Sequence, residues 1–318
     1  MPQPSAISFL GVFKEAVKGT FGAATDYLPF STAEPVDVIM PLEDNAYRGS
    51  MVDLYGWTQG PVYVTYKVAG PVFNDTIGYL LGCFFGDVTT TGAGAPFTHA
   101  FSVKNSGDGQ PVSYSFTDFY AAGTRGYSGL QCHDLSFKFS GDGMLTYEAT
   151  LTGLVETTKT KPTAAFSTRP IIPVWQGATK FGGVSALTLI SGEFNLTRAM
   201  QVIHTADGTQ APYAIFMGPV SLAGKADVVM EDDTRLTEFL SNTQPAVDFL
   251  FTQDASNTVQ LHATKAAYTG APISRDGIYV HLPIEFSGVA NATDAGASGG
   301  LSPAKVTILN AKPASTFV

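Results

Sequence analysis

The chain has 318 residues, of which 44% are hydrophobic and 14% are charged, and its formal net charge is −9. This apolar content excludes general disorder, and the acidic balance excludes nucleic-acid binding through a broad basic surface. Because charged residues make up roughly 25% of an average soluble protein, we expect partner proteins to cover part of the surface, although a neutral polar surface rich in Gly, Thr and Ala is an alternative.

Strand patterns dominate the chain. Apolar or β-branched residues alternate with polar ones in the segments Val36–Ile39, Val62–Val68, Val112–Phe119, Asp134–Phe139, Leu145–Leu151, Glu193–Arg198, Ala214–Met217, Val220–Val229, Val247–Phe251, Val259–Ala263 and Ile278–Phe286. Clusters of Gly, Asp, Asn and Pro separate these segments. Helical patterns are confined to Thr76–Phe85 and Thr234–Ser241. The sequence therefore predicts a mainly β fold with one short helix in each half.

The two halves share a pattern. Gly60-Pro61-Val62 opens a strand that a helix follows, and Gly218-Pro219-Val220 does the same in the second half. The closing strands end at Gly153 and Gly288. We therefore predict two related β-sandwich units, each with a short flanking helix, plus extended arms. The predicted parts are an N-terminal arm (1–30), a first β unit (31–154), a connector (155–184), a second β unit (185–289) and a C-terminal tail (290–318).

The connector and the tail differ from the units in composition. The connector is rich in Thr, Lys and Pro, which is typical of an ordered or semi-ordered link. The tail begins with the Gly, Ala and Ser tract Ala290–Ser302 and continues with the strand-like Ala304–Leu309. We expect a tether whose short strand docks onto a neighbouring molecule.

The sequence contains no convincing active site. Gly296-Ala297-Ser298-Gly299-Gly300 matches the G-x-S-x-G pattern of a nucleophile, but it lacks the flanking strand and helix that hold such a turn. The histidines do not pair at helical spacing, and adjacent carboxylates lie where helix capping explains them. Cys83 and Cys132 do not form a zinc or disulfide pattern, and we expect both to be buried free thiols. We predict no catalytic residue, no cofactor and no metal.

Membrane and secretion signals are also missing from the sequence. No apolar run approaches the ~18–20 residues that cross a bilayer. The first residues do not show a basic segment followed by a long apolar one, as a secretory signal would. We expect a protein that is made and used in the cytoplasm, at least initially, without a membrane partner.

The opening segment resembles a known family. It contains Gly11-Val12-Phe13-Lys14-Glu15-Ala16, then Gly19-Thr20-Phe21-Gly22 and Tyr27-Leu28-Pro29-Phe30, followed by Glu34 and Tyr47-Arg48-Gly49-Ser50. This order is similar to that of siphophage tail tube proteins (major tail proteins) of about this length, which open with a Gly-x-x-x-Glu-x-x-x-Gly-Thr segment. Cys132–Gly153 and Gly192–Arg198 extend the likeness.

The resemblance implies a structural virion protein that polymerises into stacked rings. These rings would form the tail tube, the channel for DNA ejection in a flexible, non-contractile tail. The partners would be copies of the chain itself, as trimeric rings with pseudo-sixfold symmetry or as hexameric rings, and other tail proteins such as the tape measure and the terminator. DNA would pass through the lumen without specific binding, because an acidic wall repels phosphates.

Two long hairpins are implied by the strand order. Glu34–Leu42 would pair with Val62–Val68 through a loop at Glu43–Gly60, and Gly192–His204 would pair with Ala214–Val229 through Thr205–Pro212. The first loop contains the residues that we expect to contact the next ring, which are Tyr47, Arg48, Tyr55 and Trp57. Alternatively, Tyr55 and Trp57 only cover their own sheet.

A binding module is the main alternative function. A β-sandwich adhesin or carbohydrate-binding module of a phage or bacterial surface structure would explain the aromatic residues and the β content equally well. Such a module usually has a secretion signal or belongs to a larger fibre. An enzyme would need a convergent set of catalytic side chains, which the sequence does not indicate.

Overall fold

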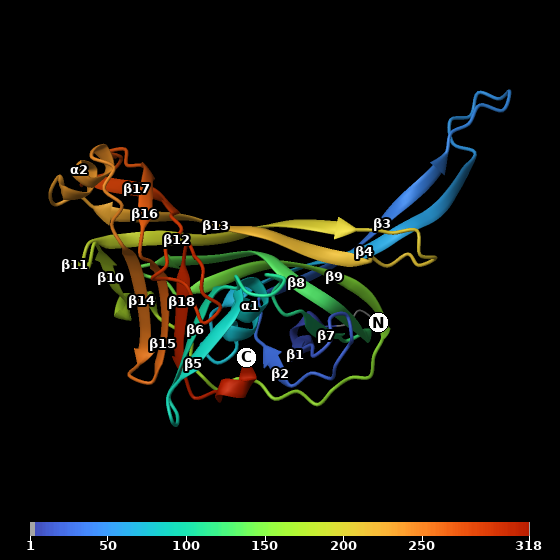
Figure 1. Ribbon diagram of the computed structural model, residues 1–318, viewed down its shortest axis with the longest axis horizontal. Helices are drawn as coiled ribbons and strands as arrows, with labels where there is room; N and C mark the ends of the chain where they lie inside the picture. The colour runs from blue at the N-terminus through green and yellow to red at the C-terminus, as the bar shows by residue number, and fades with distance from the viewer. Residues whose placement is uncertain (1–3, 318) are drawn as a thin grey trace.

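The computed structural model describes residues 4–317, and within them the chain folds into two antiparallel β-sheets and two short α-helices (Figure 1). The predicted mainly β fold is therefore confirmed. Phe139 of the first sheet packs against Phe249 and Phe251 of the second, with ring centroids 4.9 Å apart. Buried side chains from both halves of the chain form one continuous core between the sheets.

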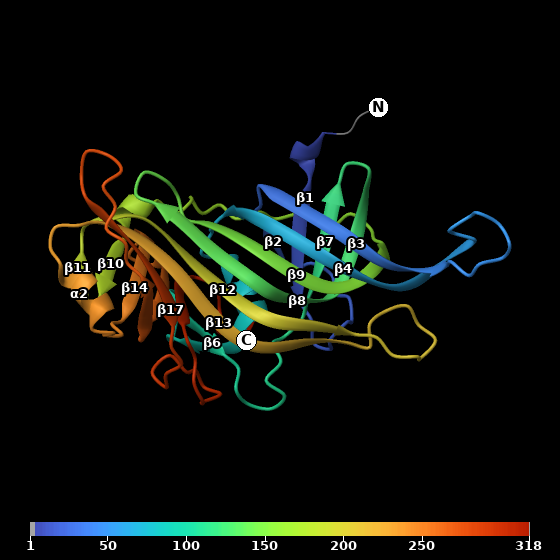
Figure 2. The same ribbon diagram turned by 90° about the horizontal axis from the view of Figure 1, so that it is seen from above.

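The first sheet contains the long strands, which Figure 2 shows side by side. Their order is β3 (Thr32–Asp44), β4 (Gly56–Pro71), β9 (Thr146–Thr158), β8 (Gly123–Ser140), β12 (Leu189–Ile203), β13 (Ala214–Val229), β17 (His281–Gly288) and β16 (Ala266–Gly270). The first half of β8 also pairs with β7 (Tyr114–Tyr120), which β1 (Phe9–Lys14) and β2 (Asp26–Leu28) extend.

The second sheet and the helices cover one side of the first sheet. The strand order in the second sheet is β11 (Val184–Ala186), β10 (Ala178–Phe181), β14 (Val247–Asp254), β15 (Asn257–Ala263), β18 (Lys305–Asn310), β6 (Phe97–Val103) and β5 (Gly86–Thr91). The helices are α1 (Ile77–Phe85) and α2 (Thr234–Leu240), and short 3-10 turns lie at Ser5–Ile7, Val174–Gln176 and Ala314–Thr316. α1 is apolar around its whole circumference and is entirely buried.

The order of elements repeats along the chain. In the first half, the hairpin β3–β4 is followed by α1, by the hairpin β5–β6 in the second sheet, and later by β8 and β9 beside β4. In the second half, the hairpin β12–β13 is followed by α2, by the hairpin β14–β15 in the second sheet, and by β16 and β17 beside β13. This repetition supports two related units, while their boundary residues stay predictions.

Bulges occur at the same places in both units. Gly60-Pro61 lies opposite the single residue Met40, and Gly218-Pro219 lies opposite Ala199. A Cβ atom at Gly60 would lie 2.2 Å from the Met40 carbonyl oxygen, so the position admits only glycine. Proline is tolerated next to it because a bulge residue need not donate to the ladder. The Gly-Pro-Val pattern in each half is therefore the mark of a bulge.

The two ends of the chain belong to the sheets. β18 lies between β15 and β6 of the same chain, so the prediction that Ala304–Leu309 docks onto a neighbour is wrong. Both edges of this strand are already paired, because the preceding tract leads the chain back to its own sheet. In the predicted N-terminal arm, β1 and β2 join the first sheet, and residues 1–3 of that arm lie outside the described residues.

Glu15 explains the Gly-x-x-x-Glu-x-x-x-Gly-Thr segment. Its carboxylate is buried and accepts hydrogen bonds from the Gly19 and Gly129 N–H groups, both at 2.7 Å. It also accepts the hydroxyls of Ser113 and Ser115, both at 2.6 Å. A buried carboxylate is stable only with such a full set of donors. Glu15 therefore fixes the turn after β1 onto β7 and β8.

We predict that Glu15→Ala lowers the free energy of unfolding by about 3 kcal/mol or more, because four buried donors lose their acceptor. Urea unfolding followed by fluorescence would measure this loss. The control is Glu148→Ala on the solvent-exposed face, for which a change within about 0.5 kcal/mol is expected. Equal effects of the two substitutions would contradict this role of Glu15.

Candidate functional site

The face of the first sheet that points away from the second sheet is polar. Along β4, β9, β8, β12, β13 and β17, its side chains alternate with buried ones. We call this set the polar face, and it comprises Thr65, Lys67, Ala69, Asp134, Ser136, Lys138, Thr146, Glu148, Thr150, Glu193, Asn195, Thr197, Ser221, Ala223, Lys225, Asp227, His281, Pro283, Glu285 and Ser287. Apart from the imidazole of His281, none of these side chains is aromatic or a large aliphatic, and Tyr63 of β4 and Val229 of β13 continue the same alternation at the ends of the set. The face is broad, hydrophilic and composed mainly of short side chains.

Carboxylates lie beside the lysines of the polar face. Lys225 Nζ is 2.7 Å from Glu285 Oε1, and Lys138 Nζ is 3.6 Å from Glu148 Oε2. Both pairs are exposed and contribute little to stability. Their effect is electrostatic, because Lys138 and Lys225 each have a carboxylate within ion-pair distance.

The same pairing recurs between the strands of both hairpins. Glu34 lies directly opposite Lys67 in the β3–β4 register, and Glu193 lies opposite Lys225 in the β12–β13 register. Opposite charges on directly facing strand residues attract each other across the ladder. The repeat thus preserves a carboxylate next to a lysine in each unit.

His281 at the end of the polar face lies between two carboxylates. Its Nδ1 is 2.7 Å from Asp227 Oδ1, and its Nε2 is 2.8 Å from Asp276 Oδ1. The hydrogen bond to Asp227 has the largest effect on the pKa of His281 and raises it, and the hydrogen bond to Asp276 raises it further. Any positive charge on this histidine is therefore matched by neighbouring anions, and the face as a whole keeps an excess of carboxylates.

The tip of the first hairpin extends beyond the rest of the molecule (Figure 1). Three of the four predicted contact residues are exposed there: Tyr47 by 93%, Trp57 by 56% and the Arg48 side chain by 54%. Met51 and Leu54 are exposed beside them, although the sequence analysis did not select them. Apolar residues inside a polar loop were the signal that could have identified both.

The other two predicted contact residues shape the tip itself. Arg48 forms an ion pair with Asp44 and lies over the ring of Tyr55, with 5.1 Å between the guanidinium carbon and the ring centroid. The Tyr55 hydroxyl donates a hydrogen bond of 3.2 Å to the Ser50 carbonyl. Arg48 and Tyr55 therefore hold the loop together, although the Arg48 side chain stays exposed.

The second hairpin is fixed to the base of the first. The Val62 N–H donates to the Gln210 carbonyl at 2.8 Å, and the Gln210 side chain donates to the carbonyls of Gly60 and Gln59 at 3.1 and 3.2 Å. Tyr213 nearby is 71% exposed. One hairpin tip is thus held by its own chain, whereas the other extends into solvent.

Arg198 connects the two units beneath the hairpins. It is almost completely buried, and its guanidinium donates to the carbonyls of Phe84, Gly218 and Gly109 at 2.8, 2.9 and 3.0 Å. Burial lowers the pKa of Arg198. Because Phe84 lies in the last turn of α1, the positive charge also faces the negative end of that helix. Arg198 therefore holds the bulge of β13 against the first unit.

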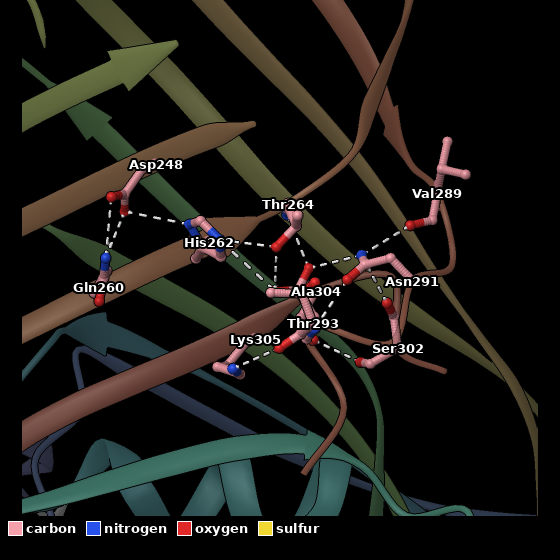
Figure 3. Close-up of polar contacts among 11 residues, drawn as sticks. Asp248, Gln260, His262, Thr264, Val289, Asn291, Thr293, Ser302, Ala304 and Lys305 are labelled. Atoms are coloured by element: carbon pink, nitrogen blue, oxygen red, sulfur yellow. Dashed lines mark hydrogen bonds and ion pairs between the residues drawn. The ribbon is translucent and has the colours of Figure 1, made fainter. Parts of the chain in front are cut away.

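A polar network holds the tract before β18 to the second sheet (Figure 3). The fully buried Asp294 carboxylate accepts the Thr264 N–H at 2.8 Å, the Thr264 hydroxyl at 2.7 Å and the Asn291 amide at 2.9 Å. His262 Nε2 lies 3.1 Å from the Thr264 hydroxyl oxygen. The small-residue tract is therefore an anchored part of the fold.

The residues considered for chemistry have structural partners. The Ser298 hydroxyl donates to the Val103 carbonyl at 3.3 Å and accepts from the Asn105 N–H at 3.1 Å. Cys83 and Cys132 are buried free thiols, as predicted, and burial raises the pKa of Cys83 to about 12. Within residues 4–317, no group of three or more His, Cys, Asp or Glu could hold a metal ion. In the same range, no helix is long and apolar enough to cross a membrane.

Comparison with known proteins gives one family. The family described as "Phage tail tube protein" matches residues 5–288 of the chain. No curated protein matches the chain. The matched range contains both long hairpins and the whole polar face.

Proposed function

The chain belongs to the phage tail tube protein family and forms the tail tube of the virion, and we propose that three copies close each ring of this tube. The observation that supports three is the strand order of the first sheet, in which both units contribute four strands to one continuous surface. Three chains would then supply six similar units and give pseudo-sixfold symmetry. Six chains would be required if only one unit lined the channel.

Ring closure gives the sheet edges a partner. In the part of the chain that the structure describes, β3 and β16 are the outer strands at the two ends of this eight-strand row. Such edges promote uncontrolled association unless they are paired or protected. A closed ring pairs each edge with the next chain, as closure of a barrel does. We also propose the division into a first unit (31–154), a connector (155–184) and a second unit (185–289).

The ring stoichiometry is directly measurable. We expect native mass spectrometry of assembled rings to give three copies of the 33.5 kDa chain, and projections along the tube axis to show threefold symmetry with six similar lobes. Six copies per ring would contradict the proposal while leaving the tube function intact.

We propose that the polar face lines the channel. Its lysines have carboxylate neighbours and its carboxylates are in excess, so a phosphate backbone would not find an unmatched cation. DNA binding to proteins depends mainly on such cations, and the affinity rises steeply with each phosphate that is neutralised. A wall without them allows DNA to slide through without specific binding.

Charge reversal on the polar face is expected to convert the tube into a DNA-binding surface. Glu148→Lys with Glu285→Lys would leave unmatched lysines in every unit, and the tubes would retain double-stranded DNA at about 50 mM salt but release it by about 200 mM. The control is Asp108→Lys, in the loop that follows β6, with Asp254→Lys, at the last residue of β14. DNA retention assays on purified tubes would compare the two, and equal retention would contradict the placement of the polar face.

We propose that the first hairpin contacts the next ring. Tyr47 and Trp57 have the exposed aromatic surface that is typical of interface hot spots, and Arg48 and Tyr55 give the tip a defined shape. The other partners that we propose are the tape measure and terminator proteins of a non-contractile siphovirus tail, with assembly in the host cytoplasm. These finer assignments are supported by the family resemblance of the sequence.

Removal of the exposed aromatic residues should weaken stacking without unfolding the chain. For Tyr47→Ser with Trp57→Ser, we expect rings to form and tubes to require at least about 30-fold more protein, since even one hot-spot residue contributes about 2 kcal/mol. Sedimentation and negative-stain microscopy would measure tube formation. The control is Trp175→Ser, which removes another exposed Trp outside the hairpins. Tubes of normal length at normal concentration would contradict the role of the tip.

A further inference from the structure

The middle of the first sheet contains a seam between the two units. β8 of the first unit and β12 of the second pair antiparallel there, with Phe137 opposite Phe194 and Lys138 opposite Glu193. Both phenylalanines are fully buried. The chain thus shows how one unit joins the next within a single sheet.

The bulges establish which strands correspond between the units. β8 has a bulge between Cys132 and Asp134, and β16 has one between Tyr268 and Gly270, each opposite the closing strand of its unit. The segment that continues β16 keeps the same alignment, because Ser274 bridges to His281. Asp134 therefore corresponds to Gly270.

The hairpins align in the same manner. The bulge residues Met40 in β3 and Ala199 in β12 occupy equivalent positions, so Glu34 corresponds to Glu193. In the same alignment Lys138 of β8 corresponds to Ser274. The two strands of the seam, β8 and β12, thus have counterparts in β16 and β3, at the opposite ends of the sheet.

We infer that the β16 edge of one chain pairs antiparallel with β3 of the next chain, in the register of the internal seam. Gly270 then lies opposite Val38 of the neighbouring copy, and Ser274 lies opposite its Glu34. This inference rests on the proposed ring, and it specifies the strands and residues that form the contact.

The backbone groups of the two edges have the required orientation. In the seam, the Gly141 N–H donates to the Ile190 carbonyl at 2.8 Å. Every second residue of β8 before Gly141 therefore directs its backbone N–H and C=O groups toward β12. Ser274 exchanges hydrogen bonds of 2.9 and 3.1 Å with His281, so its neighbours Ile273 and Arg275 direct their N–H and C=O groups outward. The segment that continues β16 therefore has free backbone groups on its outer side, which can form ladder hydrogen bonds with a further strand.

One donor is missing on the β3 side. The residues of β3 that face the neighbour in this register are Ala33, Pro35 and Asp37, and Pro35 lacks an N–H. Proline is typical of an outer edge because it interrupts indiscriminate pairing. It still accepts a hydrogen bond through its carbonyl, so the inferred ladder loses a single donor.

A cavity beside β3 fits the side chains of the neighbouring edge. It has a volume of about 730 Å³ and lies between Ser31–Pro35 of β3 and the side chains of Asp118, Tyr120 and Arg125. Ile273, which is 39% exposed, corresponds to Phe137 of the seam and would point to this side of the sheet. On the opposite side, the exposed Val36 would meet Pro272. Apolar surface on both edges is thus covered by a second copy of the chain.

Disulfide cross-linking tests the register. Glu34→Cys with Ser274→Cys places the two thiols in a pair without intervening ladder hydrogen bonds, where Cα atoms lie about 4.5 Å apart and a disulfide is feasible. Within one chain these positions are at opposite edges of the sheet, roughly 30 Å apart, so a bond can form only between copies. Val38→Cys with Gly270→Cys is an independent pair in the same register that keeps Glu34 and Ser274.

The control pair is Glu34→Cys with Gly270→Cys, which the inferred register separates by four residues, or about 13 Å. We expect both matched pairs to give a covalent ladder under mild oxidation, and the control pair to give at least tenfold less. Cys83 and Cys132 are buried, so they should not contribute.

The outcomes separate this inference from the proposed function. The inferred register would be overturned if tubes form but neither matched pair cross-links, or if the control pair cross-links more than the matched pairs. Either result would leave the proposed tube function intact. Cross-links in both matched pairs with a ladder that ends at six chains would support the register and contradict the ring of three.

Discussion

Backbone hydrogen bonding at the two ends of one sheet is the constraint on which this structure depends. An outer strand presents N–H and C=O groups that water satisfies only incompletely once apolar side chains surround them. Within residues 4–317, β3 and β16 are such strands at the ends of the row of eight, and exposed apolar residues lie on β3 and, as Ile273, on the segment that follows β16. Tail tube proteins polymerise, and under the proposed ring these two outer strands pair between neighbouring copies.

The two faces of the first sheet have separate roles. Charged groups on the inner face are buried and satisfied by many partners, as Glu15 and Arg198 are, and they fix the positions of turns, helix and hairpin. The outer face has short polar side chains and exposed ion pairs that contribute little to folding. Substitutions on this outer face can therefore change its charge without a large effect on the stability of the fold.

Local chemistry decided which parts of the fold were predictable. Both long hairpins lie where the sequence indicated them, because their strands alternate on either side of turn residues. The predicted loop Glu43–Gly60 was too long, since β3 continues to Asp44 and β4 begins at Gly56 and passes through the bulge at Gly60-Pro61. The first half of β8 was missed because its glycines interrupt the alternation. β18 was assigned to a neighbour, since the choice among distant strand partners leaves no local pattern. The internal contact of Arg48 with Tyr55 likewise required the folded loop.

The internal seam has a consequence for how assembly begins. Because β8 and β12 belong to one polypeptide, their junction forms during folding, at an effective concentration that does not depend on how many molecules the cell contains. In a ring of three chains, half of the contacts between adjacent units lie within one chain, and only the other half require two molecules to meet by diffusion. Nucleation then follows a lower power of the subunit concentration than it would for six separate units, and rings can start to form early in an infection, when the protein is still scarce.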